Sequence, residues 1–134
     1  MPISLQFDVT YFYGGSSAGI EIPVLLTANR QSIELLAKVD TGAAHCIFER
    51  RYAEMLGITV ESGRLQRFRT VAGSFDAHAH ELLLQTLGIE FTSEVYFAHD
   101  VGFSRNFLGR SGWLDRMQLG LIDQNRTLCL GSGR

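Results

Sequence analysis

The sequence contains little cysteine: Cys46 and Cys129 are the only two among 134 residues. Both have apolar neighbours and lie far apart in the chain. Two cysteines at this separation form neither the disulfide framework of a small secreted domain nor a cysteine-based zinc cluster. We therefore expect two buried thiols, no structural metal and no cofactor.

Long hydrophobic runs are also absent. The uninterrupted runs, such as 24–26 and 82–84, are far shorter than the roughly 18 residues that span a bilayer. The first residues lack the basic start and apolar stretch of a secretory signal. We expect a cytoplasmic or otherwise intracellular protein that does not bind membranes.

No block of basic residues is present, and 12 Lys and Arg against 14 Asp and Glu give a net charge of −2. This balance lacks the positive footprint of a nucleic-acid-binding protein. With 46% hydrophobic and 19% charged residues, the composition is that of a globular chain. Its length predicts a single domain over residues 1–134.

Glycine is frequent along the chain. Fourteen glycines and only two prolines separate short runs rich in Val, Ile, Phe, Tyr and Thr. This texture predicts an all-β fold rather than alternating strands and helices. Gly14 and Gly15 are expected to turn a hairpin between the first two strands, and Gly73 to form the tip of another. The expected strands are Ile3–Tyr13, Gly19–Leu26, Ser32–Val39, Arg64–Ala72, Ser74–Leu84, Ile89–Ala98, Met117–Ile122 and Thr127–Leu130.

One main helix is expected, over Glu49–Leu56. Tyr52, Met55 and Leu56 are spaced by three and four residues and so predict its buried face, while Gly57 stands where a helix cap is expected. A short helical turn is expected over Ser111–Arg116.

The strongest candidate for chemistry is Asp40, at the end of an apolar strand and followed by Thr41, Gly42, Ala43 and Ala44. Small residues allow the backbone to approach the carboxylate closely, and the Gly42 N–H is free to bond it. An ordinary Asp turn gives the same triplet, so the motif alone leaves both interpretations open.

A second motif, Phe107, Leu108, Gly109 and Arg110, comes later in the chain and is followed by a short helical turn. The hairpin at Gly73 lies between the two motifs. This order resembles the retroviral-type aspartic proteases, or retropepsins, over nearly the whole chain.

The resemblance implies a closed acid-protease barrel-like fold with a flap hairpin. It implies that Asp40 is the catalytic aspartate, that Thr41 locks two active-site turns together across a dimer, and that Gly42 positions substrate backbone. The substrate-binding residues would be Ala43, Ala44 and the flap residues Val71, Ala72, Gly73 and Ser74. Leu108, Gly109 and Arg110 would support the active-site turn.

Aspartic-protease chemistry needs two carboxylates that share one proton. No other aspartate of the chain is followed by Thr or Ser and then Gly, so the second carboxylate must come from another molecule. We therefore expect a twofold homodimer that acts as an aspartic endopeptidase on peptide or protein substrates.

Three positions depart from the viral pattern. Ala44 stands where viral members usually carry an acidic residue, so Arg110 needs another partner; Ser111 follows Arg110; and the flap has one glycine. These departures favour an alternative: a catalytically silent retropepsin-fold dimer that binds peptides or protein partners.

A metal site is a further alternative, because Asp76, His78 and His80 share one face of a strand by period 2. A solvated polar face of the hairpin explains the same pattern, and we prefer it. His45, next to the proposed catalytic turn, is interpreted as a structural or rim residue.

Overall fold

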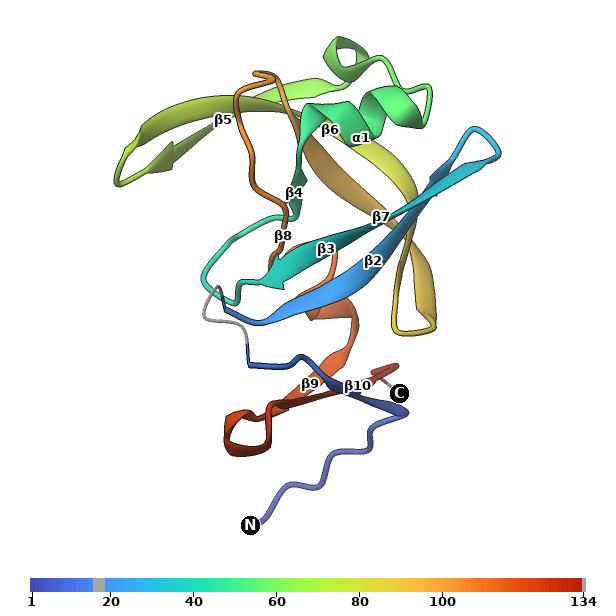
Figure 1. The fold of residues 1–134 in the computed structure, drawn as a ribbon, viewed down its shortest axis with the longest axis vertical. Helices are drawn as coiled ribbons and strands as arrows, with labels where there is room; N and C mark the ends of the chain where they lie inside the picture. Colours follow the sequence, from blue (N-terminus) through green and yellow to red (C-terminus); the bar gives the residue numbers. More distant parts are fainter. Residues whose placement is uncertain (16–18, 134) are drawn as a thin grey trace.

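The computed structural model describes residues 1–15 and 19–133 and consists mainly of β-strands (Figure 1). One α-helix and three short 3-10 helices (η) connect them. In chain order the elements are β1 Val9–Phe12, β2 Glu21–Ala28, β3 Gln31–Val39, β4 Ile47–Phe48, α1 Arg50–Met55, η1 Val60–Ser62, β5 Arg64–Thr70, β6 Gly73–Thr86, β7 Ile89–Ala98, β8 Phe107–Leu108, η2 Leu114–Arg116, β9 Gln118–Ile122, η3 Asp123–Asn125 and β10 Thr127–Gly131.

The larger sheet closes on itself. Its seven strands follow the order β2-β3-β8-β4-β7-β6-β5, and β2 also pairs with β6, so that six strands form a ring and β5 projects beside β6. A closed sheet leaves few unpaired strand edges. This arrangement confirms the predicted all-β, barrel-like fold with one helix.

Alternating side chains of β2 fill the interior of the ring, because Ile22, Val24 and Leu26 are completely buried. Trp113 is also completely buried, and its indole N–H donates to the Thr86 hydroxyl at 3.0 Å. Cys46 and Cys129 are both buried and free, as expected from the sequence.

The helix α1 ends as predicted at Gly57, which has a φ of 72°. The Gly57 N–H donates to the Glu54 carbonyl at 3.1 Å, and the Ile58 N–H donates to Ala53 at 2.9 Å. This pair of bonds is a Schellman motif, which a glycine forms without strain. The predicted buried face is wrong at Met55, which is 57% exposed, whereas Ala53 and Leu56 are buried.

The hairpin predicted around Gly14 and Gly15 is wrong. β1 pairs with β10, with Val9 opposite Leu130, while β2 pairs with β3 and β6. The two strands therefore belong to different sheets, and part of the connection, 16–18, lies outside the described residues. The first strand is also shorter than expected, because residues 1–7 have no regular structure.

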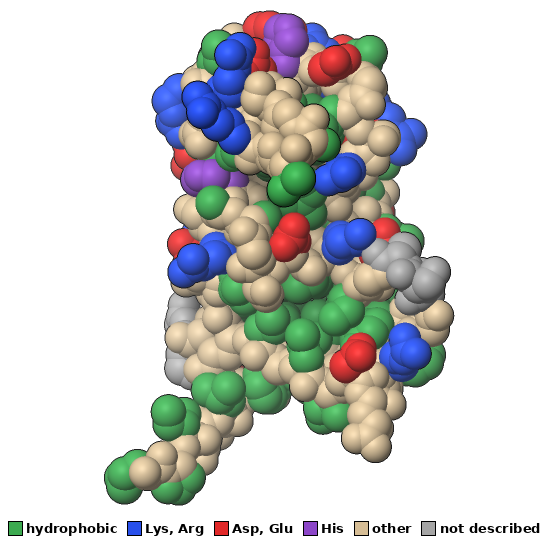
Figure 2. Space-filling view, turned by 90° about the vertical axis from the view of Figure 1, so that its left-hand side faces the viewer, with side chains coloured by type: hydrophobic (Ala, Val, Ile, Leu, Met, Phe, Trp, Pro, Cys, Tyr) green, Lys and Arg blue, Asp and Glu red, His purple; other side chains and the backbone are tan. Residues whose placement is uncertain are grey.

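A three-stranded sheet, β1-β10-β9, lies at the end of the molecule where both termini are found (Figure 1). Several large apolar side chains of this end are exposed, among them Ile3, Leu5 and Phe12. Figure 2 shows apolar side chains gathered on the lower half of one face and along the N-terminal arm. In the described part of the chain, no helix is long and apolar enough to cross a membrane.

Candidate active site

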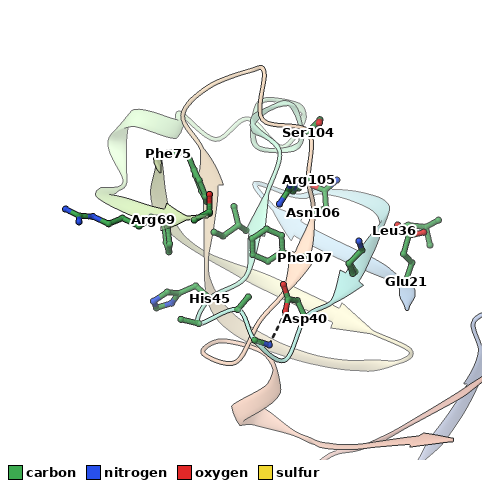
Figure 3. A pocket seen from close by; sticks show the side chains of 17 residues that line it. Glu21, Leu36, Asp40, His45, Arg69, Phe75, Ser104, Arg105, Asn106 and Phe107 are labelled. Atoms are coloured by element: carbon green, nitrogen blue, oxygen red, sulfur yellow. Dashed lines mark hydrogen bonds between the residues drawn. The ribbon is translucent and has the colours of Figure 1, made fainter. Parts of the chain in front are cut away.

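Asp40 follows β3 directly, where that strand runs parallel to β8 with Val39 opposite Leu108. The Asp40 N–H donates to the Leu108 carbonyl at 2.9 Å, which fixes the backbone at the start of the turn. The Gly42 N–H donates to Asp40 Oδ1 at 3.0 Å (Figure 3). The small residues of the turn therefore allow the local bond to the carboxylate that the sequence suggested.

The two sequence motifs interlock through their backbones. The Arg110 N–H donates to the Ala43 carbonyl at 2.9 Å, and the Ser111 N–H donates to Ala44 at 2.8 Å. A parallel bridge between His45 and Ser111 continues the contact. Residues 43–45 are thus held against 109–111, although they are far apart in the sequence.

Gly109 is required by this packing rather than by its own φ angle. A Cβ atom there would lie 2.2 Å from the His45 carbonyl oxygen and 2.8 Å from that of Ala43. Its N–H donates to the buried Cys46 thiol sulfur at 3.4 Å. Leu108, beside it, is completely buried. The predicted supporting residues Leu108, Gly109 and Arg110 therefore do contact the turn that carries Asp40.

The carboxylate of Asp40 opens into a cleft of about 780 Å³ (Figure 3). Gly42, Ala43 and Ala44 form part of its wall. The remaining lining comes from β2 to β6, from β8, from the segment before β4 and from the loop before β8. These residues are Glu21, Leu36, Lys38, His45, Ile47, Phe68, Arg69, Thr70, Phe75, Ser104, Arg105, Asn106 and Phe107.

The predicted flap is the hairpin β5–β6, which extends away from the ring in Figure 1. Thr70 pairs with Gly73, so the tip consists of Val71 and Ala72, and Gly73 is the first residue of β6 rather than the tip itself. The Thr70 hydroxyl donates to the Gly73 carbonyl at 2.9 Å. Val71 is fully exposed.

Aromatic side chains pack against one another on the flap and the cleft wall. Phe68 of β5 stacks on Phe75 of β6 with ring centroids 5.3 Å apart, and Phe103 contacts Phe75 at 4.6 Å. His45 packs edge-on against Phe68 and Tyr96. The ring of His45 therefore belongs to this aromatic cluster at the cleft wall, in agreement with a structural or rim position.

Sequence reasoning missed the loop over residues 99–106, which borders the cleft opposite the active-site turn. Asn106 anchors its end: the Asn106 side chain accepts the Glu49 N–H at 2.9 Å and donates to the Glu49 carboxylate at 2.6 Å. The Asn106 carbonyl also accepts the Lys38 N–H at 2.9 Å. An irregular loop has no periodicity, and only the proximity of Asn106 to the Phe107–Arg110 motif pointed to it.

Thr41 is exposed, and its hydroxyl forms no hydrogen bond with another described residue. Arg110 is also exposed, and no carboxylate among residues 1–15 and 19–133 lies within 4 Å of its guanidinium. Its backbone, rather than an ion pair, makes the described contact with the active-site turn.

The face that carries Asp76, His78 and His80 is not a solvated polar face, because His78 is 94% buried. Asp76 pairs with Arg67 at 2.9 Å, and this hydrogen bond lowers the pKa of the Asp76 carboxyl. His78 Nε2 lies 3.1 Å from His99 Nδ1, and His80 Nε2 lies 2.8 Å from the Val60 carbonyl. Within the described ranges, no three metal-ligating side chains converge on one point.

Comparison with known proteins gives one family. Residues 25–111 match the family described as aspartyl protease, and this range contains both interlocked motifs and the flap. No curated protein matches the sequence.

Two solved structures are similar in fold. A retropepsin-like aspartic protease from Rickettsia conorii superposes with a TM-score of 0.64 at 19% identity, over 91% of this chain and 96% of that one. EIAV protease, in complex with the inhibitor HBY-793, gives a TM-score of 0.54 at 18% identity, over 70% of this chain and 84% of that one. Since the family match covers more than half of the sequence, the chain belongs to the aspartyl protease family, and its fold is that of the retropepsin-like aspartic proteases.

Proposed function

We propose that this protein is a homodimeric aspartic endopeptidase, in which Asp40 of each copy supplies one carboxylate of the catalytic pair. The observation that carries the proposal is the position of Asp40: its backbone is fixed by β8 and its carboxylate opens into a cleft of about 780 Å³ beside a flap. The family match supports protease-like chemistry.

A single Asp40 cannot perform the reaction, because one carboxyl group must accept a proton while another donates one. At about 3 Å and an effective dielectric constant near 20, two ionised carboxylates repel by on the order of 5 kcal/mol. The pair therefore keeps one proton between them. A twofold axis beside the exposed Thr41 would bring the two turns together and give each Thr41 hydroxyl a partner in the other copy.

The hydrolysis then follows from the single shared proton. The ionised carboxylate accepts a proton from water as the water oxygen bonds to the peptide carbonyl carbon, and the neutral carboxyl donates its proton to the carbonyl oxygen. The tetrahedral intermediate collapses as the C–N bond breaks: the neutral carboxyl donates its proton to the nitrogen, and the ionised carboxylate accepts a proton from one hydroxyl of the intermediate, which gives a carboxylic acid and an amine. One water is consumed, and the pair again holds one proton.

Substrate binding would use main-chain contacts. An extended peptide in the cleft can pair with the backbone of the flap tip above it, at Val71 to Ser74, and with that of Gly42 below it, in the manner of an added strand. Ala44 provides no carboxylate for this purpose, so in this proposal the side-chain contacts come from other residues of the cleft.

The proposal is tested with the dimer at mildly acidic pH and a broad library of unstructured peptides. We expect cleavage by the wild type, inhibition by the transition-state mimic pepstatin, and a loss of about 10²-fold to 10⁴-fold in rate for Asp40→Asn with the fold retained. Glu90→Gln, an exposed carboxylate on β7, is the control and should cleave normally.

Two results would decide against the proposal. Hydrolysis that persists in purified Asp40→Asn would assign the activity to another group or a contaminant. A wild type that binds peptides without cleaving any member of the library would favour the silent peptide-binding dimer.

A further inference from the structure

The cleft differs in charge from the protein as a whole. The chain has a net charge of −2, yet the cleft is lined by the cations Lys38, Arg69 and Arg105 against only two carboxylates, Glu21 and Asp40. If two copies of Asp40 share one proton, each copy contributes half a negative charge. The cleft is therefore positive inside a slightly negative protein.

The cations of the cleft are not neutralised by neighbouring carboxylates. Among the described residues, the ion pairs within 4 Å of arginine involve Arg50, Arg51, Arg64 and Arg67, and none of these lines the cleft. No such pair involves Lys38, Arg69 or Arg105. Since exposed cations in a cleft attract anionic groups to it, their partner is expected to be a ligand.

Among the cations of the cleft, Arg105 lies where two pockets adjoin. It lines the main cleft and also a smaller adjoining pocket of about 270 Å³, which is lined by the flap residues Gly73 and Ser74 and by the rings of Phe75 and Phe103. Arg105 is the only charged residue that lines this smaller pocket among the described residues. Figure 3 shows its side chain on the same side of the cleft as Asn106, above Asp40.

Arg105 and Lys38 are held near each other by the same anchor. Asn106 follows Arg105 directly, and its carbonyl accepts the Lys38 N–H, while its side chain exchanges two hydrogen bonds with Glu49. A fixed backbone lowers the conformational cost of placing a cation against a ligand. Lys38 is two residues before Asp40, so both side chains face the same side of the strand and its continuation.

We infer that the cleft selects acidic peptide segments, and that Arg105, assisted by Lys38, is a specificity-determining residue that binds an Asp or Glu side chain near the cleaved bond. This inference rests on the proposed function. The guanidinium of an arginine suits a carboxylate because it offers two parallel N–H donors. The aromatic wall of the smaller pocket can in addition accommodate the aliphatic part of a Glu side chain.

Two carboxylates near these cations do not pair with them. Glu21 is the cross-strand partner of Lys38, and Asp100 lies in the same loop as Arg105. Asp100 Oδ1 already accepts the Gly102 N–H at 2.9 Å, and neither carboxylate reaches a cleft cation within 4 Å. The Arg105 guanidinium is therefore available to a bound peptide.

The test compares matched peptides that differ only by Glu or the uncharged isostere Gln at each position around one cleavage site. We expect a higher kcat/KM for Glu at one or more positions, by about fivefold for an exposed ion pair. Arg105→Gln should abolish the difference in kcat/KM between the Glu and Gln peptides, and Arg105→Glu should reverse it in favour of a Lys peptide. Arg116→Gln, which removes a cation outside the cleft, is the matched control.

Three outcomes separate the inference from the proposed function. Equal cleavage of Glu and Gln peptides by an active enzyme overturns the inference alone. If no peptide is cleaved, the proposed endopeptidase activity fails, and the affinity of labelled Glu and Gln peptides for the wild type and Arg105→Gln still tests the charge preference. If a single-stranded oligodeoxynucleotide displaces the Glu peptide from Asp40→Asn more effectively than an unlabelled Glu-rich peptide does, the cations serve a nucleic acid and the inference is wrong.

Discussion

Gly109 and His45 lie so close that a Cβ atom on Gly109 would stand 2.2 Å from the His45 carbonyl oxygen. The contact joins the two halves of the active-site structure, since His45 follows the turn of Asp40 and Gly109 belongs to the second motif. Neither backbone can move freely, because Arg110 and Ser111 donate to Ala43 and Ala44 on either side of the contact.

The first prediction follows from this contact. Gly109→Ala should lower the free energy of unfolding by about 1–3 kcal/mol or more, because an added methyl group in a packed interior forces the backbone apart. Urea denaturation measures the effect, and peptide hydrolysis should fall with it, since Asp40 would be displaced. Gly15→Ala is the control: its Cβ would meet nothing within 4 Å, so its stability should stay within about 0.5 kcal/mol. Equal stability of the two variants would show that the site does not depend on the close approach.

The bond between the Gly42 N–H and the Asp40 carboxylate could be predicted from the sequence, because the two residues are neighbours in one turn. The need for glycine at 109 arises from the backbone of His45, which is distant in the sequence, so only the order of the two motifs pointed to it. The strand pattern of Ile22, Val24 and Leu26 likewise follows from period-2 burial in a sheet.

The errors arose where long-range pairing decides the structure. The short strand β1 carries the same alternation in either sheet, and only its bonds with β10, at the other end of the chain, select the terminal sheet. Arg105 and Asn106 lie on an irregular loop, and their position over the cleft depends on the side chain of Glu49 and on β3. Nothing local in the sequence encodes that contact.

The second prediction concerns the proposed dimer and the N-terminal arm, residues 1–7. Its alternate residues Met1, Ile3, Leu5 and Phe7 are all exposed large apolar side chains. Ile3→Asp together with Leu5→Asp should raise the dimer dissociation constant at least about tenfold, because burying one such side chain is worth roughly 1.5–3 kcal/mol. Sedimentation equilibrium measures the change.

Met55→Asp is the control for this experiment. Met55 is also an exposed apolar side chain, but it lies on α1, at the opposite end of the molecule from the termini (Figure 1). A dimer weakened as much by Met55→Asp as by the arm substitutions would contradict a contribution of the N-terminal arm to the dimer interface. A wild type that is monomeric at every concentration would contradict the dimer itself.

The third prediction concerns acid stability. The Arg50 guanidinium donates to both carboxylate oxygens of Glu61, at 2.6 and 2.9 Å, and thereby lowers the pKa of Glu61 from 4.5 to about 2. A lowered pKa means that the stabilisation is fully present above pH 4.5 and is lost as the pH falls toward 2. Glu61→Gln should therefore lose less stability than the wild type between pH 4.5 and 2.

Chemical denaturation at fixed protein concentration, at pH 6, 4.5, 3 and 2, measures the slope of the free energy of unfolding against pH. Glu34→Gln, an exposed carboxylate on β3, serves as the control and should keep the slope of the wild type. If Glu61→Gln has that same slope, the pair with Arg50 contributes nothing to acid stability.

The fourth prediction concerns Cys46, behind the active-site turn. Burial raises the pKa of its thiol from 9.0 to about 12, although the Gly109 N–H opposes part of the shift. Because the thiolate is the reactive form, we expect Cys46 of the folded protein not to react with a thiol reagent such as iodoacetamide at pH 8. A Cys129→Ala variant isolates Cys46 for this measurement, and mass spectrometry counts the modified thiols before and after unfolding in urea.

The raised pKa of Cys46 also predicts how the stability of the fold changes at alkaline pH. A thiol whose pKa is higher in the folded state than in the unfolded state stabilises the fold fully below about pH 9, and this contribution is lost as the pH rises toward 12. Cys46→Ala should therefore lose less stability than the wild type between pH 9 and 11, whatever its stability at pH 7. Rapid alkylation of native Cys129→Ala at pH 8 would instead mean that the contact between Cys46 and Gly109 opens readily, and the active-site turn with it.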